Sequence, residues 1–325
     1  MTSSIPPVLE ARVLTLLPGD GWRLSPLVDS HNLVLRARRD GDDVVVRLQP
    51  QSRMNGATAQ ALVDFLRTVG RDPDLQVPRP VRLTTNEWVA EIEHAGRAHR
   101  CFVVTWVAGD RAQDARAFVQ PGRLGAVGET VARLHAHAQM LTAKSAPDVP
   151  RLGAFLRDEH ACAHDAVRDA LPHDLHAQLG AAYERMATVL ERQTAGSEVG
   201  LVHADLEPQN WVFDEGRPGV IDFDELRFGA FAVDLLGVLW THAMWDELPV
   251  LRTHLFDGYE RVRPLPSGTR EDADVLMGIQ FAAWLDFIFR ELSEDDRARH
   301  LEYVQPMVER IVAWCGPQQS GAGER

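Results

Sequence analysis

The chain has 325 residues, of which 45% are hydrophobic, and carries a formal net charge of −13. This length allows one large core or two smaller ones, and the acidic balance argues against a general nucleic-acid binder, which needs a basic face to neutralise phosphates. No apolar stretch is long enough to span a bilayer, and the N-terminus has no basic region followed by an apolar one, so we expect a cytoplasmic protein without membrane partners.

The first third of the chain is predicted to be mostly β-strands. Short alternating segments at 22–25, 33–38 and 44–48 indicate three strands, with Arg39-Asp40-Gly41-Asp42 as a hairpin turn. A helix is predicted over 56–69, and a connection follows over 73–80. Two more strands, at 87–93 and 100–107, flank Ala95-Gly96-Arg97 as another hairpin.

From residue 121 the hydrophobic pattern becomes helical. Apolar residues recur at three- and four-residue steps, which predicts an amphipathic helix: Leu124, Val127, Val131, Leu134, Ala138 and Leu141. Further helices are predicted over 152–171, over 175–190 with a cap near Asp174, and over 275–292, which is apolar nearly all round and should be central. The small polar residues 318–325 are expected to fray.

Cysteine usage gives no sign of a metal or redox site. Cys101, Cys162 and Cys315 are scattered and form no C-x-x-C pattern, and an odd number cannot pair completely. We expect reduced, mostly buried thiols.

The segment 201–225 carries the strongest chemical signal. His203, Asp205 and Asn210 have the order H-x-D-x-x-x-x-N on a segment that Pro208 keeps out of helix or central strand. A hairpin of strands 211–213 and 219–221 should then return Asp222 close to Asn210. A carboxylate and an amide oxygen together suit Mg²⁺, which keeps several waters and binds substrate phosphates. Asp205 is placed to accept a proton from an attacking hydroxyl.

This order is that of a kinase catalytic loop followed by its metal-binding aspartate. With Ile221-Asp222-Phe223-Asp224 carrying a second Asp in place of Gly, the chain resembles the aminoglycoside phosphotransferase and choline kinase-like family. In that family the loop usually runs H-G-D-x-H-x-x-N, so Ala204 and Glu207 are departures. The resemblance covers about residues 20–310, with its strongest motifs at 201–235.

The resemblance implies an α+β, two-lobed protein-kinase-like fold. Residues 1–107 would form the antiparallel-sheet nucleotide-binding lobe, and residues 108–325 the mainly helical lobe for catalysis and substrate. The implied reaction transfers the γ-phosphoryl group of ATP or GTP to a hydroxyl of a small molecule, such as an amino sugar or another cationic acceptor, with Mg²⁺ as cofactor. The oligomeric state stays open.

The resemblance also assigns residues to roles. Asp205 would be the catalytic base, and Asn210 and Asp222 would hold the metal. His203 would orient the loop, and Asp234, in the G-x-x-x-x-D-L pattern of 229–235, would anchor it. His135, in a helical L-H pair, is explained equally well by packing.

The nucleotide-binding residues are implied in the same way. Arg47 stands where kinases carry a phosphate-binding Lys, although it also fits a surface strand. Ser30 and Asn32 lie in the glycine-free loop 29–32, which would cover the phosphates. Thr105 and Val107 belong to the expected hinge, whose backbone would bind the adenine edge, although a buried strand would read the same.

Some family features are missing or ambiguous. The helix over 56–69 should supply a Glu to pair with Arg47, but it offers only Gln60 and Asp64, of which Asp64 is the better candidate. Asp224 and Glu207 are candidates for metal or acceptor binding, with a structural carboxylate equally expected for Asp224. Other acidic residues that could line an acceptor pocket are Asp158, Glu159 and Glu225.

Three other functions fit parts of the same pattern. A Ser/Thr protein kinase of the same fold would share the loop, but no A-P-E-like segment follows it. A nucleotide-binding regulator with little catalysis would explain Arg47 and the missing helix Glu. A metal-dependent phosphohydrolase would use the same His and Asp residues without a nucleotide.

Overall fold

The structure is a computed structural model that describes residues 5–29, 33–141, 148–157, 167, 169, 171–196 and 198–316. The chain forms two compact units. The first, called the sheet unit, comprises residues 1–112, 140–149 and 209–226; the second, called the helical unit, comprises 113–139, 150–208 and 227–325. The lobe boundary at 107/108 stays a prediction, since the sheet unit also takes in two later stretches of the chain.

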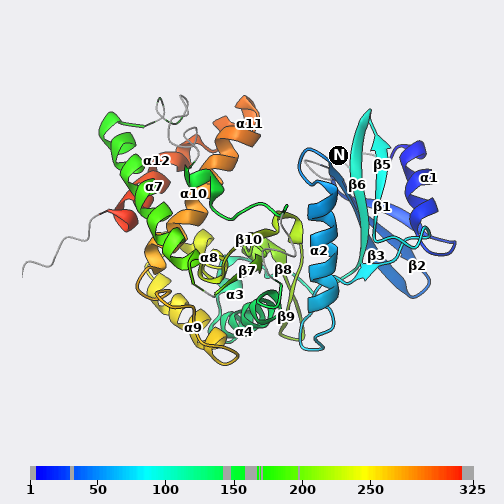
Figure 1. The fold of residues 1–325 in the computed structure, drawn as a ribbon, viewed down its shortest axis with the longest axis horizontal. Helices are drawn as coiled ribbons and strands as arrows, with labels where there is room; N and C mark the ends of the chain where they lie inside the picture. Colours follow the sequence, from blue (N-terminus) through cyan, green and yellow to red (C-terminus); the bar gives the residue numbers. More distant parts are fainter. Residues whose placement is uncertain are drawn as a thin grey trace, which may run out of the picture. The chain divides into compact units, whose positions relative to one another are not determined.

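The sheet unit is built on six antiparallel strands (Figure 1). They run in the order β1-β2-β3-β6-β4, with β5 also pairing with β6. Their bounds are Arg23–Asp29 (β1), Leu33–Arg39 (β2), Asp42–Pro50 (β3), Pro80–Val81 (β4), Val89–His94 (β5) and Arg97–Thr105 (β6). The predicted strands and both hairpins are therefore confirmed.

The side chains of β3 alternate between the hydrophobic core and the opposite face of the sheet, which carries Arg47. Val44, Val46 and Leu48 are buried in one hydrophobic cluster, to which helix α1 (Pro7–Leu16) contributes Leu9 and Val13. Because successive side chains of a strand point to opposite faces, Val45 and Arg47 face away from this cluster. No element is predicted for the first twenty residues, so α1 is an addition to the predicted fold.

Helix α2 (Gly56–Val69) has the predicted bounds. Asn55 caps it, since its side-chain oxygen accepts the backbone N–H of Thr58 at 2.8 Å. Figure 1 shows α1 and α2 on opposite sides of the sheet.

The predicted hairpin after the catalytic loop forms strands β8 (Trp211–Asp214) and β9 (Arg217–Val220) and belongs to the sheet unit. At its turn, Glu215 and Gly216 have φ of 48° and 84°, the left-handed pair that tight hairpins prefer. Isolated bridges from Gln76 to Gly219 and from Asp110 to Phe213 join the hairpin to the rest of the unit.

The helical unit contains longer helices around one short sheet, in which β7 (Val199–Val202) pairs with β10 (Arg227–Ala230). Its helices with described bounds are α3 (Ala115–Phe118), α4 (Pro121–Ala138), α7 (His173–Thr194), α8 (Phe231–Gly237), α9 (Leu248–Glu260), α10 (Ala273–Glu291), α11 (Glu294–Ala298) and α12 (Leu301–Cys315). Short 3₁₀ turns lie in the helical unit at Ala154–Arg157 (η1) and Trp240–His242 (η4), in the sheet unit at Phe223–Glu225 (η3), and at Pro208–Asn210 (η2), where the chain passes from one unit to the other.

Helix α10 packs against α7, α8 and α12, as its apolar sequence predicts. Most of its large side chains are buried, including Ile279, Phe281 and Leu285, whereas Phe287 is exposed. Within the described residues, no helix is long and apolar enough to cross a membrane.

Two helix predictions need correction. The helix expected over 152–171 does not begin at Leu152, because Gly153 has φ of +74° and the 3₁₀ turn η1 follows. Val167 and Asp169, later in the predicted range, are helical, and residues 158–166, 168 and 170 lie outside the described part. The cap expected at Asp174 is also wrong. Helix α7 begins at His173 after Pro172, which places Asp174 in the first turn without a capping bond.

Candidate active site

A cavity of about 450 Å³ opens in the sheet unit, lined by residues of β2, β3, β6 and the hairpin. Its walls are largely apolar and include Val34, Val45, Val104, Val107, Val212 and Ile221. Arg47 and Asp222 add charged groups to this lining. An apolar cavity of this size with a few polar groups has the usual composition of a small-molecule site.

The end of strand β6 at Thr105 and the residues that follow it line this cavity. The backbone N–H of Thr105 donates to the Arg79 carbonyl at 2.8 Å, and the Thr105 hydroxyl accepts the Arg79 N–H at 3.0 Å. The Trp106 N–H donates to the Asp43 carbonyl at 3.0 Å. Within the described part of the chain, the backbone of Val107 makes no hydrogen bond. Val107 lines the cavity, and its backbone donor and acceptor are not used by the described residues.

Arg47 is held by two carboxylates of the loop that follows the hairpin. Its side chain is only 12% exposed, and its Nη2 donates to Asp222 Oδ1 at 2.6 Å and to Asp224 Oδ2. Burial by itself lowers the pKa of Arg47, but Asp224 and Asp222 outweigh this and raise it. The buried Nε of Arg47 has no hydrogen-bond partner among the described residues.

The two carboxylates differ in their surroundings. The side chain of Asp222 is 43% exposed, whereas that of Asp224 is 8% exposed. Burial raises the pKa of Asp224 to about 6, and the nearby charge of Arg47 opposes this rise. Asp222 is therefore the carboxylate that a ligand can reach.

The residues expected to bind metal meet at the base of the hairpin. The Ile221 N–H donates to the Asn210 carbonyl at 2.9 Å, which brings the residue before Asp222 against Asn210. The described residues contain no cluster of three or more His, Cys, Asp or Glu side chains suited to a metal. One carboxylate and one amide fit Mg²⁺ with phosphate and water as its other ligands.

The helical unit holds the catalytic loop through Asp234, which is 2% exposed. Its carboxylate accepts the backbone N–H of Ala204 at 2.7 Å and that of His203 at 3.2 Å. The ring Nδ1 of His203 in turn accepts the Asp205 N–H at 3.2 Å. Asp234 and His203 thus hold the backbone of residues 203–205, and their supporting roles in catalysis stay predictions.

His135 contributes to the same network. Its Nε2 lies 3.0 Å from Asp234 Oδ2, and its Nδ1 lies 3.0 Å from the Tyr259 hydroxyl. The helical L-H pair was a usable signal for this contact. Tyr259, on the distant α9, had none.

The structure describes only some of the remaining predicted site residues. Ser30, Asn32, Asp158 and Glu159 lie outside the described residues, and Glu207 is partly buried. Asp64 does not pair with Arg47, because its carboxylate accepts a bond from Arg67 Nη1 at 3.1 Å on the same helix.

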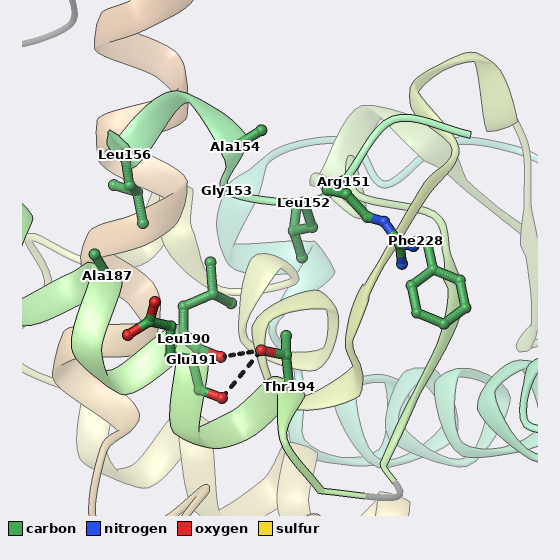
Figure 2. A pocket seen from close by; sticks show the side chains of 10 residues that line it. All are labelled: Arg151, Leu152, Gly153, Ala154, Leu156, Ala187, Leu190, Glu191, Thr194 and Phe228. Atoms are coloured by element: carbon green, nitrogen blue, oxygen red, sulfur yellow. Dashed lines mark hydrogen bonds between the residues drawn. The ribbon is translucent and has the colours of Figure 1, made fainter. Parts of the chain in front are cut away.

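A second cavity, of about 290 Å³, lies within the helical unit beside α7 (Figure 2). Leu152, Leu156 and Leu190 supply apolar side chains, and Thr194 and Glu191 supply polar ones. The guanidinium of Arg151 lies over the ring of Phe228, 4.5 Å from its centroid. A small molecule with both apolar and polar groups would suit this lining.

Solved structures share this fold at low sequence identity. A microcompartment-associated aminopropanol kinase aligns with a TM-score of 0.77 and 19% identity over 95% of this chain and 98% of its own. An amicoumacin kinase aligns with a TM-score of 0.74 and 17% identity over 93% of both chains. A spectinomycin phosphotransferase aligns with a TM-score of 0.61 and 11% identity over 90% of this chain and 92% of its own.

No curated protein sequence matches the chain at a significant level. The sequence profile of the phosphotransferase enzyme family, by contrast, matches residues 25–271, which is most of the chain and includes the cavity of the sheet unit, the catalytic loop and Asp234. Together with a protein-kinase-like fold, this match shows that the chain belongs to the phosphotransferase enzyme family.

Proposed function

We propose that this protein transfers the γ-phosphoryl group of ATP or GTP to a hydroxyl of a small molecule with the help of Mg²⁺. The observation that carries the proposal is Arg47, a largely buried cation that lines an apolar cavity beside Asp222. A guanidinium in such a place suits the oxygens of a phosphate group, which it binds through charged hydrogen bonds.

The nucleotide would occupy the cavity of the sheet unit. Its base would lie between the apolar walls, with the backbone of Val107 bonding its edge and Thr105 beside it. Arg47 would bind the phosphates, and Ser30 and Asn32 would cover them. The proposal keeps both ATP and GTP as donors.

Asn210 and Asp222 would hold Mg²⁺, which when bound would neutralise charge on the transferred phosphate. Asp205 would accept the proton of the acceptor hydroxyl, on a loop that Asp234 and His203 keep in place. Replacing Asp205 by Asn should abolish transfer and leave nucleotide affinity intact, as measured by product formation and by calorimetry.

A small acceptor is favoured over a protein. The similar solved structures are named as kinases of aminopropanol and amicoumacin and as a spectinomycin phosphotransferase. The net charge of −13 suits a cationic acceptor, and the cavity beside α7 is our proposed acceptor site.

The acceptor site can be tested by filling that cavity. Ala154 lines it and is exposed, so Ala154→Trp should raise the KM for the acceptor and leave the KM for the nucleotide unchanged. Ala177→Trp, at an exposed position of α7 outside the cavity, is the control. Equal KM values in the two variants would place the acceptor elsewhere.

The decisive experiment for the function is a thermal-shift titration with ATP and GTP, with and without Mg²⁺. A ligand that binds only the folded protein raises its melting temperature. We expect a Mg²⁺-dependent shift in the wild type and in Asp214→Ala, an exposed position of the hairpin, and its loss in Asp222→Ala. An unaltered shift in Asp222→Ala would contradict the assigned metal ligand.

Product analysis separates the alternatives. Phosphate release from a phosphoester without nucleotide would indicate a phosphohydrolase. Nucleotide binding without transfer to any amino sugar or amino alcohol would indicate a regulator. Phosphorylation of Ser or Thr in added protein would indicate a protein kinase.

A further inference from the structure

We propose that Asp224 is a positioning residue, whose buried carboxylate anchors Arg47 in the orientation that binds phosphate. It would replace the glutamate that helix α2 lacks. The inference rests on the proposed function, because it assigns Arg47 to the nucleotide, but it gives Asp224 a role distinct from metal or acceptor binding.

Arg47 needs a permanent partner because its charge cannot be removed. A guanidinium stays protonated in proteins, and burying it without a carboxylate is strongly unfavourable. The Arg47 side chain is 12% exposed, and its described ion pairs are with Asp222 and Asp224.

Helix α2 cannot supply this partner. Asp64 is half-exposed and bonds to Arg67, while the buried face of the helix consists largely of apolar side chains such as Leu62 and Phe65. Phe65 instead packs edge-on against Phe223, with ring centroids 6.1 Å apart and an interplanar angle of 62°. The helix thus contacts the residue between Asp222 and Asp224 through an aromatic ring, and the charge contact comes from the loop itself.

Asp222 and Asp224 differ in exposure, and we assign them different roles for that reason. Asp222, at 43% exposed, is accessible to a metal ion, whereas Asp224, at 8%, is enclosed with Arg47. When Asp222 binds Mg²⁺, it has less charge to offer Arg47, and Asp224 remains as the anchor. One guanidinium would thereby stay fixed both before and after the metal binds.

The test is Asp224→Asn, which preserves size and removes charge. Losing an anchor of this kind should raise the nucleotide Kd by roughly tenfold to hundredfold, the range for a lost charged hydrogen bond. The Mg²⁺ concentration for half-maximal activity at saturating nucleotide and the KM for the acceptor should not change. Asp214→Asn, in the exposed turn, serves as the control and should match the wild type in all three values.

A double-mutant cycle makes the result specific to the pair. In an Arg47→Met background, Asp224→Asn should cause no further loss of nucleotide affinity, because the residue that it positions is gone. Additive losses would overturn the inference, as would a raised Mg²⁺ requirement or a raised acceptor KM in Asp224→Asn. A wild type that binds no nucleotide would instead refute the proposed function, so the two failures are distinguishable.

Folding provides a second measurement should Asp224→Asn prove too unstable to assay. The single variant leaves Arg47 with only the more exposed Asp222 as its partner, whereas Arg47→Met combined with Asp224→Asn buries no cation. The double variant should therefore melt at a higher temperature than Asp224→Asn alone. A double variant that melts lower would overturn the pairing.

Discussion

Ala204, in the loop that carries His203 and Asp205, has a strained backbone conformation. Its φ of +66° lies in the left-handed region, and Asp234 fixes it there through the bond from the Ala204 N–H. The resembling family usually carries Gly at this place, where a Cβ is unfavourable by about 1–2 kcal/mol. The loop of this protein therefore carries backbone strain that a Gly at this position would not impose.

We expect Ala204→Gly to raise the free energy of unfolding by about 0.5–1 kcal/mol, since Gly relieves the strain but gains freedom in the unfolded chain. The matched control is Ala181→Gly, at an exposed position within α7, which should lower it by about 1 kcal/mol. Urea unfolding measures both. A destabilising Ala204→Gly would show that Ala204 is not strained.

His135 should make stability depend on pH. Burial lowers its pKa, although the bond to Asp234 opposes this, so between the lowered value and about 6.5 the unfolded chain binds more protons than the folded one. Stability is then fully present above about pH 6.5 and falls as the pH falls through this window. Burial lowers the pKa of His242 in the same sense.

Urea unfolding between pH 7.5 and 5 tests this expectation. His135→Asn should be less stable than the wild type at pH 7.5, yet its free energy of unfolding should fall less on acidification. Adding His242→Phe should reduce the remaining dependence on pH further. A slope that neither substitution changes would assign the pH dependence to other groups.

At the scale of elements, α4 and α9 pack through glycines. A Cβ on Gly258 would lie 2.0 Å from the Gly125 carbonyl oxygen, and one on Gly128 would lie 2.2 Å from that of Leu255. The backbones of the two helices therefore touch directly. This contact holds α9, and with it the Tyr259 hydroxyl that bonds to His135.

Gly258→Ala should lower the free energy of unfolding by about 1–3 kcal/mol, because backbone atoms must move to admit the methyl group. Gly180→Ala, on α7 with no atom near the added Cβ, should instead raise it by roughly 0.5–1 kcal/mol. Chemical unfolding of both variants decides the matter. Equal effects of the two substitutions would mean that α4 and α9 can separate without loss.

The sequence was informative about local structure and poor at long-range pairs. Alternation and turn residues predicted the strands and the hairpin, and the helix predicted over 56–69 corresponds to α2. The pairing of Arg47 with Asp224 was missed because nothing in the spacing of β3 and the loop encodes a contact across 177 positions. The false helix start at Leu152 came from apolar periodicity that ignored the left-handed Gly153.

At the scale of the whole molecule, each unit contains a buried thiol. Burial raises the pKa of Cys101, in the sheet unit, and of Cys315, in the helical unit, to about 12, so neither should react with a thiol reagent at pH 8 while folded. Cys162 lies outside the described residues and is replaced by Ser in the experiment.

Mass spectrometry of the labelled Cys162→Ser protein then reports on each unit separately. Nucleotide with Mg²⁺ should slow the labelling of Cys101 in mild denaturant, because the proposed nucleotide site lies in the sheet unit. Protection of Cys315 alone would contradict that placement.

The sheet unit is assembled from segments that are far apart along the chain, and this affects how its charged site forms during synthesis. Its hairpin, with Asn210, Asp222 and Asp224, is encoded after two stretches of the helical unit, residues 113–139 and 150–208, have been translated. The six strands of the sheet are therefore synthesised well before Asp222 and Asp224, the partners of Arg47. Until those residues are translated, the Arg47 guanidinium of the nascent chain lacks both carboxylates. The sheet can form early, but its charged site closes only once residue 224 has left the exit tunnel, and truncated products should lack it entirely.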